Sequence, residues 1–172
     1  MFLEFNKNLV RQYLRVLETH DTGVLYDIIH PEYKPQLIGM PNTTLKIMTK
    51  LTNGKYSGIE ELIKRLEIFF EFWQDATISA LQFVAENNMV IAFFSIEFSH
   101  NGELLGIKPT GKRVSTSTYY HFTIKDNKII GAHMLQDFFD IVRQIGLEVY
   151  EDEEILIKDY LETIKSNNKF YI

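Results

Sequence analysis

Helical and strand patterns occupy two separate blocks of this chain. Up to about residue 73 the apolar residues recur at helical spacing, and from about residue 76 they alternate in short runs separated by turn residues. Helices followed by consecutive hairpins are typical of an α+β fold, whereas nucleotide-binding folds alternate strand and helix. The order therefore predicts a curved, mostly antiparallel sheet that is closed by the N-terminal helices.

The first block predicts three helices. The first ends near His20, and its apolar stripe consists of Val10, Tyr13, Leu14 and Leu17. Asp21 caps a short second helix, which stops at His30-Pro31, and residues 34–57 are predicted to be loop with room for one short strand. The capping box Ser57-x-x-Glu60 opens the third, whose stripe is formed by Ile59, Leu62, Ile63, Leu66, Phe69, Phe70 and Trp73.

The second block predicts strands at 76–85, 89–99, 103–107, 113–124 and 128–136. The turns between them are Asn87-Asn88, Asn101-Gly102, Pro109-Thr110-Gly111 and Asp126-Asn127. Two helices complete the chain, one over 138–145 that Gly146 ends and one from the acidic cluster at 151–154 to about 165. We predict a single domain over residues 1–150 with a C-terminal helical extension at 151–172.

The amino-acid composition indicates which kinds of molecule the protein can bind. The 172 residues include 13 Phe, 9 Tyr and 1 Trp, and aromatic side chains often line cavities for flat organic molecules. A net charge of -5 without a basic run makes nucleic acid an unsuitable partner. No stretch approaches the roughly 20 apolar residues that span a bilayer, and Glu4, Asn6 and Lys7 stand where a secretory signal would be apolar, so we expect a cytoplasmic protein with no membrane partner.

The sequence lacks the residues that several kinds of catalysis and metal binding require. The absence of cysteine excludes thiolate nucleophiles, zinc-thiolate sites and iron–sulfur clusters. No nucleophile elbow, phosphate loop, dinucleotide fingerprint or His-Glu-x-x-His helix occurs, and no two histidines stand at a metal-binding spacing. We therefore expect no metal site.

Five short segments, in order, resemble the SnoaL-like polyketide cyclase family, within the nuclear-transport-factor-2-like cone fold. They are 29–33 (IHPEY), Ser57-Gly58, 100–112 (HNGELLGIKPTGK), 122–129 (FTIKDNKI), and Asp137 seven residues before Gln144-Ile145-Gly146. The resemblance covers residues 8–147. It implies a conical sheet with an apolar pocket under a helical lid, and ring closure by aldol addition with an Asp and a His but no cofactor.

Carried over position by position, the resemblance places the family's catalytic aspartate on Met134 and its histidine on Tyr120. A thioether is no base, and a phenol has an ordinary pKa of about 10. Ring-closing activity is therefore an open question, and a one-residue shift would bring His133 or His121 into play. Alternation along the strands places these two histidines on the faces opposite Met134 and Tyr120.

Asp137 and Tyr120 are the two candidate catalytic residues. Asp137 is either a base at the pocket mouth or the N-cap of the helix at 138, and the cap is favoured. Tyr120 shares a strand face with Phe122 and Ile124, so its hydroxyl either orients a substrate carbonyl or bonds the backbone. The candidate substrate-binding residues, which are equally explained as core, are Tyr13, Tyr26, Trp73, Phe94, Phe122 and Met134.

Three functions stay open on the sequence. The first is a cofactor-free cyclase, isomerase or hydrolase acting on a small carbonyl compound, and the second is a module that only binds a small apolar molecule. The third is a dimeric interaction protein, and we expect a homodimer through the outer sheet face because Tyr119, His121 and Thr123 make it aromatic and uncharged.

Overall fold

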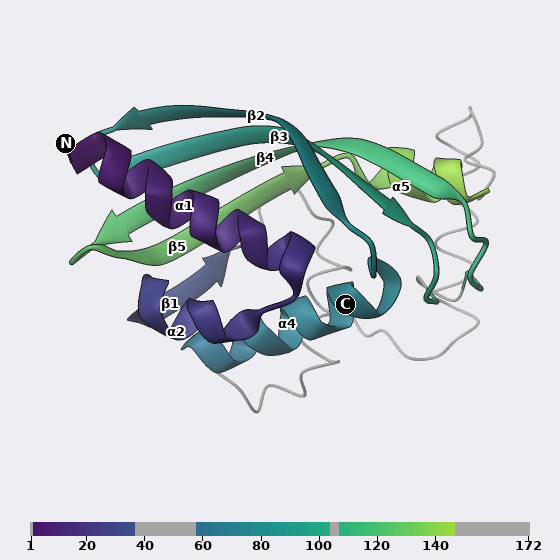
Figure 1. Ribbon diagram of the computed structural model, residues 1–172, viewed down its shortest axis with the longest axis horizontal. Coiled ribbons are helices and arrows are strands. Elements are labelled where there is room, and N and C mark those ends of the chain that lie inside the picture. Colours follow the sequence, from purple (N-terminus) through teal and green to yellow (C-terminus); the bar gives the residue numbers. More distant parts are fainter. Residues whose placement is uncertain (1, 37–57, 104–106, 147–172) are drawn as a thin grey trace, which may run out of the picture.

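A curled five-stranded sheet with helices on its inner side forms the protein (Figure 1). The computed structural model describes residues 2–36, 58–103 and 107–146. The elements run in the order α1 (Phe2–Thr19), a short 3-10 turn (Thr22–Val24), α2 (Leu25–Ile28), β1 (Ile29–Gln36), α4 (Gly58–Phe72), β2 (Thr77–Glu86), β3 (Met89–Ser99), β4 (Arg113–Lys125), β5 (Lys128–Gln136) and α5 (Phe138–Ile145). The predicted α+β class with a curved, mostly antiparallel sheet is confirmed.

The strands lie in the order β1-β5-β4-β3-β2. All neighbours are antiparallel except β1 and β5, which are parallel. The sheet curls without closing, and β2 carries a bulge between Ser79 and Gln82 in which Ala80 has φ +52°. Such a bulge bends its strand and increases the local twist, which helps the sheet to curl around α1.

One face of the sheet is buried. On β3 the buried side chains alternate from Val90 to Phe98, and on β4 from Val114 to Ile124. We call this the inner face, and the opposite one the outer face. Phe94, Phe98 and Phe122 are fully buried there, and each contributes about 1.5–3 kcal/mol through burial. The aromatic residues of the sheet therefore anchor the core.

The start of β1 is a difference from the sequence prediction. Residues 30–31 were expected to stop a helix, yet Ile29 already opens a strand that contains Pro31 and Pro35. Proline lacks the N–H that a central strand needs. β1 tolerates both prolines because it is an edge strand that pairs only with β5.

The segment between β3 and β4 also differs. A strand was predicted over 103–107, but Glu103 is not in a strand and Ile107 forms only an isolated bridge, while 104–106 lie outside the described residues. β3 and β4 instead pair directly from Ser99 and Arg113. His100 organises the connection, since its Nδ1 lies 3.0 Å from Thr110 Oγ1.

The other short turns and caps follow the sequence. Asp126 and Asn127 both have positive φ, as a tight hairpin turn requires. Gly146 ends α5 at φ +108°. Ser57, most of the loop at 34–57 and the predicted helix at 151–165 lie outside the described residues, so the predicted division at residue 150 stays a prediction. No helix among the described residues is long and apolar enough to cross a membrane.

The cap of α5 yields a stability prediction. The carboxylate of Asp137 accepts a hydrogen bond of 2.9 Å from the backbone N–H of Asp140. Asp137→Ala should lower the free energy of unfolding by about 1 kcal/mol, because it leaves this N–H without its cap. Urea denaturation at neutral pH measures the change. Asp137→Ser and Asp137→Asn retain a capping oxygen and should stay close to wild type, whereas equal losses in all three variants would contradict the cap.

Candidate active site

Three buried tyrosines meet where α1, β1 and β4 approach one another. Tyr13, Tyr33 and Tyr120 are 3%, 3% and 8% exposed. Tyr13 lies close enough to Tyr33 and Tyr120 for each of them to affect the pKa of its hydroxyl. We call these three residues the tyrosine cluster. It brings three hydroxyl groups into an otherwise apolar interior.

Packing holds the cluster in position. The ring centroid of Tyr13 lies 5.1 Å from that of Phe122 and 5.9 Å from that of Tyr120, both in edge-to-face geometry. Tyr120 stacks on Phe122 at 5.3 Å and on Phe94 at 6.0 Å. Such aromatic contacts are favourable beyond the area they bury. The hydroxyls are therefore presented by a rigid aromatic layer.

Burial sets the protonation of the cluster. It raises the pKa of Tyr13 and of Tyr120 well above the ordinary value of a phenol, and each of these two residues also has a second tyrosine as a neighbour. Burial likewise raises the pKa of Tyr33, with a further contribution from Tyr120. All three phenols are protonated at neutral pH, so they can donate hydrogen bonds but cannot act as bases.

A buried ion pair lies beside the cluster. Arg65, in the middle of α4, is 7% exposed, and its Nε donates to Glu61 Oε1 at 3.1 Å while Nη2 donates to the same oxygen. The charges of Arg65 and Glu61 both act on Tyr33. The Nη1 atom of Arg65 is buried and has no hydrogen-bond partner within the described part of the chain. The pair thus leaves one donor unused.

Five of the predicted site residues come together. Met134 is the direct cross-strand partner of Tyr120, so the two positions that the resemblance assigns to catalysis face one another across β4 and β5. Both are buried on the inner face. The residues that the fold gathers there are Tyr13, Phe94, Tyr120, Phe122 and Met134.

Three predicted residues lie elsewhere. Trp73 is buried beyond the end of α4, where it stacks on Phe98 at 4.6 Å. Tyr26 is 55% exposed and its hydroxyl donates to Glu60 at 2.9 Å. Asp137 is exposed and caps α5. Roles for Trp73 in binding, for Tyr26 in binding and for Asp137 in catalysis stay predictions, and none of these three joins the tyrosine cluster.

The sequence analysis did not single out Tyr33, Glu61 or Arg65. A signal for the ion pair was present, because Arg65 stands three residues after Leu62 and four before Phe69, within the apolar stripe of the helix. A charge at such a position requires a partner, and Glu61 is the residue one turn earlier. Tyr33 carried no comparable signal, since its strand was not predicted.

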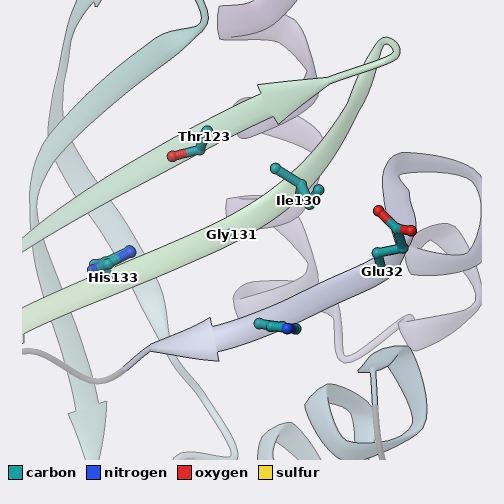
Figure 2. Close-up of a pocket in the computed structure, with 6 residues that line it drawn as sticks. Glu32, Thr123, Ile130, Gly131 and His133 are labelled. Carbon is teal, nitrogen blue, oxygen red and sulfur yellow. The ribbon is translucent and has the colours of Figure 1, made fainter.

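A groove lies on the outer face of the sheet (Figure 2). It has about 510 Å³ and is lined by Glu32, Lys34, Thr123, Ile130, Gly131 and His133. His133 pairs across the strands with His121, and the two rings lie 5.4 Å apart on this face, as the alternation predicted. This groove is separated from the tyrosine cluster by the sheet itself.

The part of the chain that the structure describes contains no candidate metal site. No three His, Asp or Glu side chains there are grouped in a way that could hold a metal ion. His100, for example, contacts Thr110 in the loop between β3 and β4.

Solved structures share this fold at low sequence identity. AclR from Streptomyces galilaeus, described as a hydroxylase, has a TM-score of 0.69 at 15% identity, with 91% of this chain and 94% of that chain covered. TsrD from Streptomyces laurentii has 0.67 at 20% identity, covering 83% and 96%. A SnoaL-like polyketide cyclase from Agrobacterium tumefaciens has 0.62 at 16% identity, covering 82% and 98%.

Sequence comparison identifies the family. No curated protein sequence matches this chain significantly. The sequence pattern of the SnoaL-like polyketide cyclases, in contrast, matches residues 7–145, which include most of α1, the whole described sheet and α5. The chain therefore belongs to the SnoaL-like polyketide cyclase family.

Proposed function

We propose that this protein binds a small carbonyl compound against the inner face of its sheet and activates it by cofactor-free acid/base chemistry. The observation that carries the proposal is the tyrosine cluster, which places protonated hydroxyls in an apolar interior. Family membership supports the same class of ligand. Cyclisation, isomerisation and hydrolysis all begin by polarising such a carbonyl group.

The cluster acts as a hydrogen-bond donor to the carbonyl oxygen. When a proton leaves the neighbouring carbon, negative charge develops on that oxygen, and fixed donors in a dry site stabilise it. Tyr120 lies on the rigid sheet, and Tyr13 orients its hydroxyl from the helix above. Tyr120 is therefore the electrophilic residue of the proposal, and the acid of any proton transfer back to the substrate.

A second candidate function is binding without reaction. It is favoured by two observations, the exposed position of Asp137 at the start of α5 and the presence of Met134 and Tyr120 at the two catalytic positions of the resemblance.

In the catalytic proposal a carboxylate removes the proton, and the candidates are Asp137 and Glu61. Glu61 is half-buried and already accepts two hydrogen bonds from Arg65.

Tyr120→Phe distinguishes binding from catalysis. With butyrophenone as the probe, loss of one neutral hydrogen bond should weaken binding about two- to tenfold in titration calorimetry. If the protein is an enzyme, wild type should speed exchange of the ketone's α-hydrogens in heavy water, followed by NMR, and the variant should slow this exchange about 100-fold. Tyr119→Phe, one residue away on the outer face, is the matched control and should change neither.

The outcomes separate the two functions. Binding that depends on Tyr120 without accelerated exchange would leave the binding module as the function. Binding that is unaffected by Tyr120→Phe would contradict the role of the cluster altogether.

The raised pKa values predict alkaline instability. The folded pKa of each clustered tyrosine lies above the unfolded value of about 10, so stability is unaffected below pH 10 and falls as the unfolded phenols ionise. Each such group should lower the free energy of unfolding by about 1.4 kcal/mol per pH unit above 10. Denaturation between pH 9 and 11.5 should show a smaller slope for Tyr120→Phe than for wild type. Equal slopes would mean that Tyr120 ionises in the folded protein.

Homodimerisation through the outer face remains part of the proposal. Ile91, Tyr119 and Leu135 are 44%, 49% and 52% exposed on neighbouring strands, and Tyr119 packs on Phe93 with ring centroids 4.6 Å apart. We call these four residues the outer patch. An uncharged apolar patch across three strands suits a second copy of the same surface.

Introducing a charge into the outer patch tests the proposed dimer. Wild type should have a dimeric mass by light scattering at micromolar concentration, and Leu135→Glu should give monomers, because two copies would bury like charges. Leu3→Glu, at an exposed position on α1 away from the outer face, is the control and should leave the dimer intact. A monomeric wild type would refute the dimer.

A further inference from the structure

We infer that the groove on the outer face is a second binding site, for a flat organic molecule that carries one carboxylate. The groove has about 510 Å³, which falls within the usual range of small-molecule sites, about 300–1,000 Å³. The sheet separates it from the tyrosine cluster, so the inference does not depend on the function proposed above.

A glycine forms the floor of the groove. Gly131 on β5 pairs with Lys34 on β1 and with Thr123 on β4, so these three residues form one row across three strands. Figure 2 shows Thr123, Ile130 and His133 around the bare backbone at Gly131. Because neighbouring strands are about 4.8 Å apart, the Cα atoms of Lys34 and Thr123 lie about 10 Å from each other. The row therefore leaves a flat-bottomed space between two side chains.

The backbone does not require a glycine at position 131. Gly131 does not have a positive φ, and the nearest atom that an added Cβ would meet is the backbone oxygen of Lys34 at 4.0 Å. The bulge at the neighbouring Ile130 does not explain the glycine either, because only a left-handed bulge residue needs one. A glycine weakens a strand interior, and one that neither φ nor close packing explains is typical of a position where a ligand approaches the backbone.

The groove carries one uncompensated positive charge. Glu32 at its edge is paired with Lys125, whose Nζ lies 3.1 Å from Glu32 Oε2. Lys34 is exposed and has no ion pair or hydrogen bond among the described residues. In a protein with a net charge of -5, this lysine makes the groove a locally favourable place for an anion.

The groups beside Lys34 suit a carboxylate on an apolar body. The Thr123 hydroxyl makes no hydrogen bond within the described part of the chain, and Nδ1 of His133 is buried, so this ring presents Nε2 to the groove. An imidazole can carry its proton on Nε2, and a carboxylate has one oxygen for the ammonium group and one for these donors. Ile130 supplies apolar contact for the body of the molecule. A phosphate dianion would keep one charge without a partner.

Calorimetry with 2-naphthoate tests the inference, and 2-naphthamide, in which an uncharged amide replaces the carboxylate, is the matched probe. Wild type should bind 2-naphthoate at least about tenfold more tightly than 2-naphthamide, as expected for hydrogen bonds between charged groups. Inorganic phosphate at the same concentration should not displace 2-naphthoate. Equal affinity for the two naphthalene probes, or displacement by phosphate, would overturn the inference.

Two substitutions locate the binding. Gly131→Val places a branched side chain on the floor of the groove, so it should keep the melting temperature at or above that of wild type and weaken 2-naphthoate binding at least about tenfold. Lys34→Met removes the charge, and this variant should bind 2-naphthoate and 2-naphthamide within about twofold of each other. Lys108→Met, which removes the same charge in the loop that precedes β4, is the control and should bind both probes as wild type does.

A comparison with Tyr120→Phe separates the groove from the tyrosine cluster. If 2-naphthoate binds in the groove, Tyr120→Phe should leave its affinity unchanged. Binding that Tyr120→Phe weakens and Gly131→Val leaves intact would place the probe at the tyrosine cluster, which would overturn this inference while supporting the proposed function. No binding of 2-naphthoate by wild type would also overturn the inference, without bearing on the carbonyl compounds of the proposed function.

Discussion

Burial of a single face of the sheet is the constraint on which the rest of this structure depends. Along β3 and β4 every second side chain is buried and, apart from Thr116 and Thr118, apolar, and α1 covers that face. Since strand side chains alternate with a period of two, a slip of one residue would place Phe94 and Phe122 in water. The same alternation orients Tyr120 inward and Tyr119 and His121 outward. Positions of functional interest are thus consequences of core packing.

Polar groups inside such a core must be paired, and the way they are paired defines the site. Tyr13, Tyr33 and Tyr120 lie together in the core, and Arg65 is held by Glu61. Tyr13 from α1 and Tyr120 from β4 both pack against Phe122, which fixes their positions in the core. Donors held in fixed positions are the condition for electrostatic stabilisation of a developing charge, on which the proposed function depends.

The outer face of the sheet is not constrained by core packing. Its groove and its exposed residues Ile91, Tyr119 and Leu135 are free of the packing that restricts the inner face. Asp137 illustrates a similar separation, because its carboxylate stabilises the start of α5 outside the tyrosine cluster.

Sequence by itself determined the elements whose signals are local. The stripe of α1, the alternation of β3 to β5, the Asp126-Asn127 turn, the cap at Asp137 and the stop at Gly146 each depend on neighbours within a few residues. The alternation also predicted that Tyr120, Phe122 and Ile124 share one face of their strand. Only the tertiary structure decided that Tyr33 joins them, because β1 is a proline-containing edge strand that forms by pairing with β5, about a hundred residues away. It also decided that Arg65 is buried and paired with Glu61, since burial is a property of what packs around a residue and not of the residue itself.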